Sequence, residues 1–482
     1  MKHVYTLLPA LVAFALGCGS SSTTASDSLA SIKGPTDTGA PSTNVPASTT
    51  SVVKGLLGPV DVLRDKNGMV HIYATTATDA FRVEAYQMAR DRTVQAELVR
   101  RTAEGSLAEI LGTPDLIDQD IFIRAIGLKR VAQQMYDAMP KNSRTKKWLD
   151  AYADGITQFN ANLQSGVEKL PAAMVGLPLA AFGPWTGVDV LAVARLEAFD
   201  LSYTGDDEVA KTRFVAAAKS AFNSNATSAD AQKRAGFLVD TFRFAPLDPT
   251  PVLPGFPTDA IATPKTGAKI FIHRSDALRS GKNTVPKAKQ LWETAVARVR
   301  GMFGSLGATG SNNWVLDPKL SATGHAMLAN DPHLALSAPP VFWAVHVNVT
   351  STDANENLDF AGMSFPGIPG VILGFNEHLA WGATTANYDV SDVYEETLTA
   401  DGASVMFKGA PVALQTVHET INVAGAQPIQ YDVKIVPQHG VILPNIDPTT
   451  HQILAPSGSA ISSRWTGQVP TNDIEAIVGL LG

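Results

Sequence analysis

A serine placed between a glycine and two asparagines is the feature of this sequence with the clearest chemistry. It lies in the run Gly310-Ser311-Asn312-Asn313-Trp314, far from the start of the chain. Cutting the Gly310–Ser311 peptide bond would give Ser311 a free α-amine beside its own hydroxyl. An α-amine has an unperturbed pKa of roughly 7.7–8, so it can act as the base that activates that hydroxyl. A Gly-Ser pair is also a common loop dipeptide, so these five residues alone leave a structural interpretation open.

The same hydroxyl could make the cut. Ser311 Oγ would attack the carbonyl carbon of Gly310, the acyl group would shift from nitrogen to oxygen, and water would hydrolyse the ester. Glycine at position 310 leaves the carbonyl unshielded and tolerates a strained backbone. The sequence therefore predicts a chain that is inactive until it cleaves itself at this bond.

Longer runs support this interpretation. From Ser311 the chain reads SNNWVLDPKLSATGHAMLANDPHLALSAPPVFWAVHVNV, and from Met363 it reads MSFPGIPGVILGFNEHLAWGATTANYDVSDVYEE. These runs resemble the penicillin acylase family of N-terminal nucleophile hydrolases. The upstream run VDVLRDKNGMVHIYATTATDAFRVEAYQMARDRTVQAELVRRTAEGSLAEILG resembles the start of the family's α-chain, and SSRWTG resembles its arginine-tryptophan element. The resemblance extends from about Val60 to the end of the chain.

The resemblance implies roles for four residues besides Ser311. His333 stands where cephalosporin and acyl-homoserine-lactone acylases carry histidine, and where penicillin G acylases carry glutamine. Its implied roles are a backbone amide donor to the oxyanion and an imidazole contact to the new α-amine, although an isolated histidine is more often structural. Thr385 corresponds to the second backbone oxyanion donor, and such donors contribute on the order of 3–4 kcal/mol each. Leu334 and Leu373 fall where the walls of the family's acyl pocket lie.

A calcium site is also implied by the resemblance. Asp389 and Asp392 would supply carboxylates, Ser391 a carbonyl oxygen, and Glu208 a carboxylate from the α-chain region. Hard oxygen ligands from separate segments suit calcium. Two aspartates in a turn are, on their own, usually a solvated cap. We expect the metal to be structural and to help hold two cleaved chains together.

The end of the chain departs from the family pattern. The family's β-chain continues beyond the arginine-tryptophan element, where it provides an oxyanion asparagine and an arginine that orients it. This sequence ends at Gly482, shortly after an expected helix start with Asn472 as cap and Glu475 three residues later. We therefore expect a fragment, a truncated reading frame or half of a split gene, and we do not expect Asn313 to replace the missing asparagine.

The fold implied by the resemblance is α+β, a four-layer αββα sandwich of two antiparallel sheets between helical layers, with Ser311 at the start of a central strand. The residues themselves favour a hairpin over 60–64 and 70–74, with a turn at Lys66-Asn67-Gly68. A long helix follows, capped by Thr78 or Asp79. Its buried face is expected to carry the residues Phe81, Ala85, Met88 and Ala89.

The rest of the chain divides into regions with different expected roles. Arginines and an aspartate in this first helix are expected to form a structural ion network: Arg90, Asp91, Arg92, Arg100 and Arg101. Residues 140–240 are expected to be mostly helical and 244–264 to be a loop. The region 53–275 corresponds to the α-chain, 276–310 to a spacer removed on maturation, and 311–482 to the N-terminal part of the β-chain.

Cys18 is the only cysteine in the chain, and its position predicts export. An apolar run over 7–16, too short to span a membrane, precedes it, so residues 1–18 resemble a secretory signal ending in a lipobox. The order Ala15-Leu16-Gly17 is unusual for a lipobox, which leaves an ordinary signal peptide as the alternative. Residues 19–52 are rich in Ser and Thr and are expected to be a disordered tether. We expect a periplasmic or outer-membrane lipoprotein whose membrane contact is limited to that anchor.

Composition restricts the class of partner. The chain has 482 residues, 45% of them hydrophobic, and a formal net charge of −7. A chain of this length and composition can bury a sizeable core. The negative charge, and the absence of a basic stretch interleaved with aromatic residues, argue against nucleic acid as a partner.

We therefore expect an exported, self-cleaving amide hydrolase that becomes an αβ heterodimer and acts on small N-acyl amides. The substrates would be β-lactam antibiotics or acyl-homoserine lactones. The alternative is a catalytically silent lipoprotein that keeps the fold as a binding or structural module. A classical serine hydrolase is a weaker third hypothesis, because the run Gly362-Met363-Ser364-Phe365-Pro366 lacks the final glycine of a nucleophile elbow.

Overall fold

The computed structural model describes residues 53–170, 174–203, 311–334, 338–384, 388, 390–447 and 449–481. The chain divides into two compact units, residues 1–48 and 49–482, and every described residue belongs to the second. The expected signal segment over 1–18, the tether over 19–52, the expected loop over 244–264 and the spacer over 276–310 lie outside the described residues.

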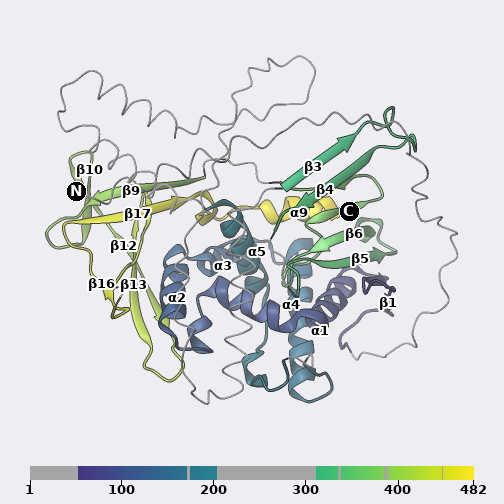
Figure 1. The fold of residues 1–482 in the computed structure, drawn as a ribbon, viewed down its shortest axis with the longest axis horizontal. Helices are drawn as coiled ribbons and strands as arrows, with labels where there is room; N and C mark the ends of the chain where they lie inside the picture. Colours follow the sequence, from purple (N-terminus) through teal and green to yellow (C-terminus); the bar gives the residue numbers. More distant parts are fainter. Residues whose placement is uncertain are drawn as a thin grey trace, which may run out of the picture. The chain divides into compact units, whose positions relative to one another are not determined.

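A six-stranded sheet contains strands from both sides of Ser311 (Figure 1). Its strands follow the order β1 (Asp61–Arg64), β2 (Val70–Ala74), β5 (Trp343–Val349), β6 (Leu358–Ser364), β7 (Leu373–Asn376) and β8 (Ala380–Trp381). All neighbours are antiparallel except β2 and β5, which are parallel. The expectation of a purely antiparallel sheet is therefore wrong at this pair. Parallel neighbours need a long crossover, and here helices separate the two strands in sequence.

A second sheet is antiparallel throughout. It has the order β12 (Gln415–Ile421), β13 (Ile429–Val436), β14 (Gly440–Ile442), β17 (Ser459–Trp465) and β9 (Ser391–Thr397). Two small antiparallel pairs accompany it: β10 (Ser404–Phe407) with β11 (Ala410–Ala413), and β15 (Asn445–Ile446) with β16 (Ile453–Leu454). Helices and sheets together make the described part an α+β structure.

Ser311 begins strand β3 (Ser311–Leu316), which pairs with β4 (Met327–Pro332). Within the described residues these two strands form a sheet of their own. The expectation that Ser311 starts a strand is confirmed, but the expectation of a central strand is wrong for this part of the chain. The hairpin is also exposed: Trp314 keeps 69% of its surface accessible.

The predicted N-terminal hairpin is confirmed. Strands β1 and β2 pair from Asp61 with Tyr73 to Arg64 with Val70. In the turn, Asp65 Oδ1 accepts hydrogen bonds from the backbone nitrogens of Asn67 and Met69, at 2.9 and 2.8 Å. Gly68 adopts a φ of +87°, which is the left-handed region that glycine enters without steric cost.

Helix α1 (Ala77–Glu104) is capped two residues earlier than Thr78, the first of the two expected caps. Its N-cap is Thr76, whose side chain accepts from Asp79 N at 3.1 Å. The expectation of Thr78 or Asp79 as the cap is wrong, because the Asp79 carboxylate accepts hydrogen bonds from an earlier segment instead of capping the helix. Its Oδ2 accepts from the backbone nitrogens of Leu57 and Gly58, at 2.9 and 3.1 Å, and holds the preceding segment.

The remaining helices are α2 (Pro114–Ile126), α3 (Leu128–Ala138), α4 (Arg144–Gln164), α5 (Gly187–Ser202) and α9 (Asp473–Leu481). Short 3-10 turns occupy Leu107–Glu109, Leu179–Ala181, Ala354–Glu356 and Thr466–Gln468. The expected helical region beyond residue 203 lies outside the described residues. None of the helices in the described segments combines the length and apolar character that a membrane-spanning helix requires.

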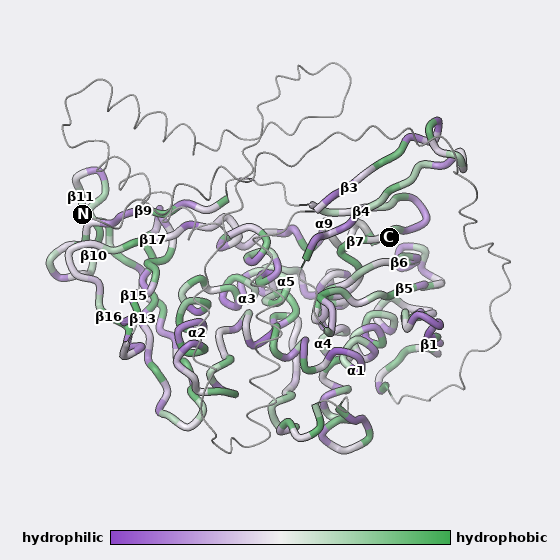
Figure 2. The backbone as a smooth tube through the Cα atoms, viewed as in Figure 1, coloured by the Kyte–Doolittle hydropathy of each residue, from purple (hydrophilic) through white to green (hydrophobic). Residues whose placement is uncertain are grey.

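The main core lies where α1 packs against α4 and against strands β2 and β5. The predicted buried face of α1 is confirmed, because Phe81, Ala85, Met88 and Ala89 have no accessible surface. Hydrophobic and hydrophilic stretches follow one another along the helices, as expected for elements with one buried side (Figure 2). Complete burial of a side chain such as Phe81 contributes roughly 1.5–3 kcal/mol to the free energy that stabilises the folded state.

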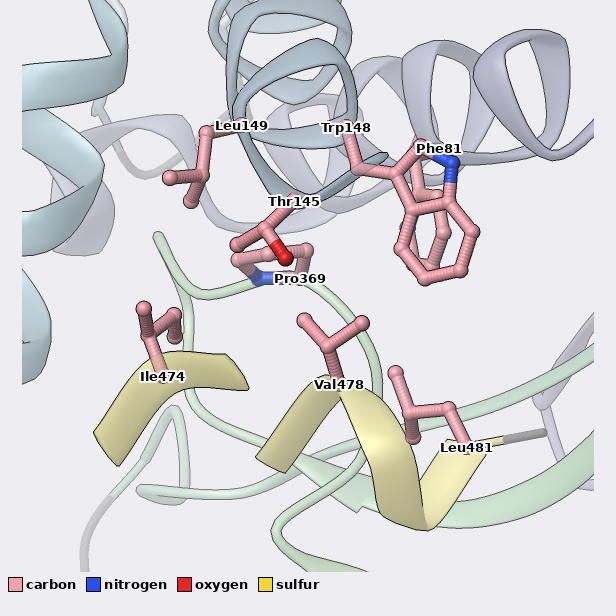
Figure 3. Close-up of a pocket in the computed structure, with 8 residues that line it drawn as sticks. All are labelled: Phe81, Thr145, Trp148, Leu149, Pro369, Ile474, Val478 and Leu481. Atoms are coloured by element: carbon pink, nitrogen blue, oxygen red, sulfur yellow. The ribbon is translucent and has the colours of Figure 1, made fainter. Parts of the chain in front are cut away.

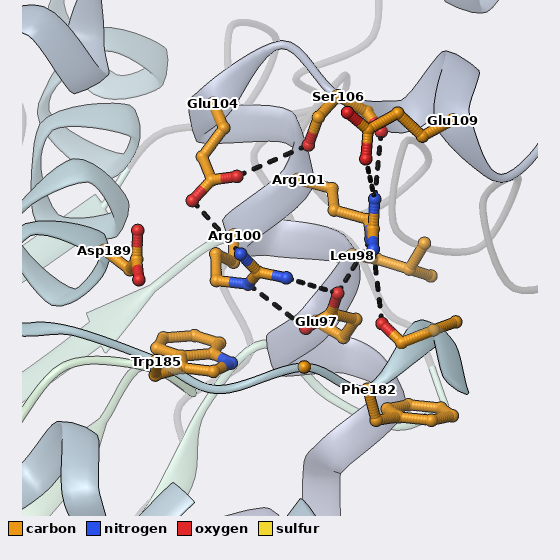
Figure 4. Close-up of polar contacts among 12 residues, drawn as sticks. Glu97, Leu98, Arg100, Arg101, Glu104, Ser106, Glu109, Phe182, Trp185 and Asp189 are labelled. Carbon is orange, nitrogen blue, oxygen red and sulfur yellow. Dashed lines mark hydrogen bonds and ion pairs between the residues drawn. The ribbon is translucent and has the colours of Figure 1, made fainter. Parts of the chain in front are cut away.

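The expected ion network is present and centres on Arg100 and Arg101 (Figure 4). Arg100 contacts Glu97 Oε1 at 2.6 Å and Glu104 Oε1 at 3.2 Å. Arg101 contacts Glu97 Oε1 at 2.7 Å and Glu109 Oε2 at 3.0 Å. Burial lowers the pKa of Arg100, but the carboxylates of Glu97 and Glu104 outweigh it and raise that pKa above its ordinary value.

The other members of the expected network have weaker partners. Arg90 lies 3.7 Å from Glu168, and Asp91 pairs with Arg64 at 2.9 Å in a partly exposed position. Arg92 has non-helical backbone angles and marks a kink within α1. The buried part of the network is therefore the part on which stability depends most.

Arg100→Ala is expected to destabilise the protein by about 3–5 kcal/mol, because it removes the buried cation that two buried carboxylates share and leaves each with one partner, Arg101 for Glu97 and Lys129 for Glu104. The measurement is the midpoint of urea unfolding followed by circular dichroism. Lys434→Ala is the control, since Lys434 pairs with Asp432 at 3.7 Å on the surface and its loss should cost less than about 0.5 kcal/mol. Equal midpoints for the two variants would contradict a structural role for the buried network.

Candidate functional site

Ser311 lies at the first position of β3, directly opposite Pro332 at the last position of β4. Its side chain is partly buried, and the preceding Gly310 lies outside the described residues. The strand pairing brings Ser311 close to the segment that carries His333, which follows β4. The structure therefore brings together the expected nucleophile and the segment of one expected oxyanion donor.

His333 makes its hydrogen bonds within this hairpin. Its Nε2 lies 2.9 Å from Asp331 Oδ2 and 3.3 Å from Asn312 Nδ2. The hydrogen bond from His333 lowers the pKa of Asp331. In the continuous chain the nitrogen of Ser311 is a peptide nitrogen, so the expected contact between the imidazole and an α-amine has no counterpart here. The side chain of His333 is about half exposed, so it remains accessible.

Asn330 links the start of β3 to the segment that leads to Thr385. Its Nδ2 donates to the backbone oxygens of Asn312 and Ala383, at 2.8 and 3.0 Å. Its Oδ1 accepts from Ala383 N at 3.3 Å. Gly382 allows this approach, because a Cβ there would lie 2.6 Å from the Cβ of Asn330. Thr385 itself lies outside the described residues.

Sequence patterns alone assign no role to Asn330, although its side chain links two backbone segments. Its position three residues before His333 gives no reason to assign it a function, since one of its partners, Ala383, lies 53 residues away. The signal available in the sequence was the glycine at position 382, which marks a close approach of another group. One side chain thus aligns two of the backbone segments that the expected oxyanion site needs.

The two expected acyl-pocket residues lie at the edge of the main core. Leu334 is partly buried and packs against that core, and Leu373 is 9% exposed at the start of β7. The loop before β7 is fixed by Glu84 of α1, whose Oε1 accepts from Gly370 N at 2.9 Å. Burial raises the pKa of Glu84 well above its ordinary value, although the hydrogen bond from Gly370 acts in the opposite direction.

An apolar cavity lies beside this loop but is not an acyl pocket (Figure 3). Its volume of about 10 Å³ leaves space for one water molecule at most. Helix α9 closes it, and a side chain at Gly370 would meet Leu481. The residues lining it are Phe81, Thr145, Trp148, Leu149, Pro369, Ile474, Val478 and Leu481. The cavity marks the packing of α9 against α1 and α4.

Two of the four expected calcium ligands can be placed. Ser391 is buried at the start of β9, opposite Trp465 of β17. Asp392 is exposed, and its Oδ2 accepts from Tyr394 Oη at 3.2 Å. Glu208 and Asp389 lie outside the described residues. In the part of the chain that the structure describes, no three His, Cys, Asp or Glu side chains converge on a common metal position.

The weaker serine-hydrolase hypothesis receives no support from Ser364. This residue has no accessible surface, and its Oγ donates to Ile368 O at 2.9 Å. A buried hydroxyl that is already a donor to the backbone is not available to a substrate.

The tryptophan of the arginine-tryptophan element has a structural role. Trp465 is buried, and its Nε1 donates to Ser202 Oγ at 3.0 Å.

Comparison with known proteins gives one family. The family model described as penicillin amidase matches residues 59–481. An acyl-homoserine lactone acylase, QuiP, from Pseudomonas aeruginosa is 30% identical over 403 residues, which are 83% of this chain and 41% of the relative. A penicillin acylase 2 proenzyme from Pseudomonas sp. strain SE83 is 27% identical over 83% of this chain and 45% of the relative. The penicillin G acylase of Escherichia coli is 27% identical over 85% and 49%.

The chain thus spans less than half the length of these curated relatives. Among solved structures, a thermostable penicillin G acylase from Alcaligenes faecalis matches with a TM-score of 0.32 at 20% identity. That match covers 41% of this chain and 98% of the other.

Asn330→Ala is expected to free the segment at Ala383 from the start of β3. Amide hydrogen exchange at Ala383 should become faster, and the free energy of unfolding should fall by about 1–2 kcal/mol, because the variant removes the partners of backbone groups. Asn312→Ala is the control, since its side chain makes only long contacts of 3.3 and 3.5 Å and should change both quantities little. Unchanged exchange at Ala383 would show that Asn330 does not align the two segments.

Proposed function

Because the chain belongs to the penicillin amidase family, we propose that it is a self-processing amide hydrolase that transfers an acyl group from an amide nitrogen to Ser311 and then to water. The observation that carries the proposal is the arrangement at the start of β3. There Ser311 lies opposite the segment of His333, and Asn330 ties the same strand to the segment that leads to Thr385. Ser311, the Asn330–His333 stretch and the segment at Ala383 come from three parts of the chain, so the arrangement depends on the fold.

Maturation would start with Ser311 in the uncut chain. Its Oγ attacks the carbonyl carbon of Gly310, and the C–N bond breaks as the C–O ester bond forms. The proton of the hydroxyl ends on the released amine. Water then hydrolyses the ester, which leaves a new carboxylate on Gly310 and a free α-amine and hydroxyl on Ser311.

Turnover would use the same atoms. The neutral α-amine accepts the proton of Oγ while Oγ attacks the carbonyl carbon of the substrate amide. The backbone N–H groups of His333 and Thr385 donate to the oxyanion that forms. The α-ammonium returns the proton to the leaving amine, which departs and leaves an acyl ester on Ser311. A water molecule, deprotonated by the same amine, attacks the ester and releases the carboxylic acid.

The substrate class we propose is N-acyl amides, either β-lactam antibiotics or acyl-homoserine lactones. The names of the relatives include both kinds of acylase. The histidine at position 333 favours acyl-homoserine lactones or cephalosporin-type substrates over penicillin G. Leu334 and Leu373, both apolar and at the edge of the core, would contact the acyl chain.

We also propose that the two cleavage products stay together as an αβ heterodimer within an αββα sandwich. Contacts between residues before 204 and after 310 support this. Arg124 and Arg130 donate to Glu419 at 3.0 and 2.9 Å. Arg195 forms an ion pair with Asp473 at 2.9 Å, and Trp343 Nε1 donates a hydrogen bond to Asp91 at 2.9 Å. Strands β2 and β5 pair in parallel.

Calcium would strengthen the same association. Glu208, Asp389 and Asp392 would supply carboxylates and Ser391 a carbonyl oxygen, which is the hard donor set that calcium prefers. The metal would fix the start of β9 to the α-chain region.

The last part of the proposal is export as a lipoprotein anchored through Cys18, with a periplasmic or outer-membrane location.

Purified, exported protein is expected to contain a fragment that begins Ser-Asn-Asn-Trp, detected by intact mass and N-terminal sequencing. Ser311→Ala removes the attacking hydroxyl and should give one uncut chain. Ser321→Ala is the control because this serine lies in the turn of the same hairpin and should not affect cleavage. An uncut wild-type chain would contradict self-processing and would favour the silent lipoprotein module instead.

The two fragments are expected to elute together in size-exclusion chromatography and to separate only in denaturant. Glu419→Ala removes the acceptor of two arginines, each such hydrogen bond contributing about 1.5–3 kcal/mol, so separation should occur at lower urea. His418→Ala is the control on the same strand, since its side chain is 80% exposed. Fragments that elute apart without denaturant would disprove the heterodimer.

A further inference from the structure

Two histidines face each other across the parallel pair of β2 and β5. His71 and His346 are register partners, and their side chains lie on the side of the sheet away from the main core. Their strand neighbours Val70, Ile72 and Val345 are buried on the opposite side. The two imidazoles are 26% and 18% exposed, so they are held by neighbours and still reachable from solvent.

The ring nitrogens of this pair are arranged in a specific way. His71 Nδ1 and His346 Nδ1 are 3.1 Å apart. The far nitrogens face carboxylates: His346 Nε2 lies 2.9 Å from Asp359 Oδ1, and His71 Nε2 lies 4.0 Å from Asp65 Oδ2. A carboxylate favours a proton on the nitrogen that faces it. Asp359 therefore directs His346 toward the tautomer with Nε2–H, so that its Nδ1 carries a lone pair. The 4.0 Å separation from Asp65 is too long for a hydrogen bond, so His71 can donate its Nδ1–H to that lone pair across the 3.1 Å gap.

One shared hydrogen between the two Nδ1 atoms accounts for this separation when both rings are neutral. A divalent metal ion binds neutral imidazole, so it could replace that hydrogen and be held by both Nδ1 lone pairs. The parallel register of β2 and β5 already brings the two ligand atoms together.

We propose that His71 and His346 bind a late first-row divalent metal ion, of the zinc and nickel class, through their Nδ1 atoms. Imidazole nitrogen is a preferred ligand of these metals, at about 2.0–2.1 Å for zinc. Two such bonds at a tetrahedral angle place the nitrogens about 3.3–3.4 Å apart, close to the separation observed. The protein supplies two ligands and water supplies the others, since the rings are open to solvent.

The carboxylates act on the metal through the histidines. Asp359 holds the ring of His346 in the tautomer that presents Nδ1, as carboxylates do for histidine ligands of zinc. Metal binding would turn His71 to the same tautomer, with its Nε2–H facing Asp65 at 4.0 Å. A metal ion here would join β2, before the expected cleavage site, to β5, after it. The site uses none of the groups of the proposed acylase chemistry and does not depend on that proposal. Its nitrogen ligands also distinguish it from the oxygen ligands of the proposed calcium site.

The test is isothermal titration of the full-length protein with Zn²⁺ and with Ni²⁺, together with the thermal midpoint at each metal concentration. Wild type should bind one ion per chain at this site and melt at a higher temperature as the metal concentration rises. His71→Ala and His346→Ala should each weaken that binding at least about tenfold. Asp359→Asn should weaken it by about tenfold through the orientation of His346. Ca²⁺ should compete with neither metal.

His418→Ala is the matched control, because His418 is a single imidazole paired with one carboxylate, Asp432, at 2.6 Å. It should bind both metals as wild type does. Circular dichroism of each variant without metal establishes whether it is folded. If either alanine variant fails to fold, Asp359→Asn still tests the site, because it keeps both histidines. Metal binding and thermal midpoints that are the same in wild type, His71→Ala and Asp359→Asn would overturn the proposal.

Discussion

The parallel pairing of β2 with β5 is the contact on which the rest of the described structure depends. Five consecutive residue pairs join them, from Val70 with Val345 to Ala74 with Val349. The same two strands form one of the surfaces that α1 packs against, while α4 covers more of that helix. Without this pair, β1 and β2 would be an isolated hairpin, which is marginal in water. The pair also unites segments that lie on opposite sides of Ser311 in the sequence.

Buried charge is the second constraint, and it is concentrated at the end of α1. Glu97, Arg100 and Glu104 lie within two helical turns and are nearly inaccessible. Glu104 also contacts Lys129 of α3 at 2.8 Å, and Lys129 contacts Asp189 of α5 at 3.3 Å. Such a network contributes little net stability compared with apolar packing, but it penalises any arrangement in which one partner is displaced. It therefore defines how α1, α3 and α5 fit together more than it strengthens their association.

The sequence predicted the elements with local signals and missed the contacts between distant segments. The hairpin at Gly68, the buried face of α1 around Phe81 and the strand that begins at Ser311 depend on neighbouring residues, and each is confirmed. The cap at Thr76 was missed because the carboxylate of Asp79 binds Leu57 and Gly58, which lie 22 and 21 residues earlier. Asn330 and the His71–His346 pair could not be found from the sequence. The contact of Asn330 with Ala383 spans 53 residues, and the histidines meet through strand pairing across 275 residues.

The loop that leads to the candidate acyl pocket illustrates why burial and charge must be considered together. Gly370 N donates to Glu84, whose other carboxyl oxygen has no hydrogen-bond partner. An ionised carboxylate in that position would be buried with one oxygen unsatisfied, which is costly. Burial instead raises the pKa of Glu84, so the neutral acid is the form that the fold prefers. Since the pKa is higher in the folded than in the unfolded chain, Glu84 stabilises the fold fully below the unfolded pKa, near 4.5. That contribution is lost as pH rises toward the folded pKa. The loop is thus held by an uncharged hydrogen bond in a dry environment, which places an apolar wall beside Leu373 without a charge next to it.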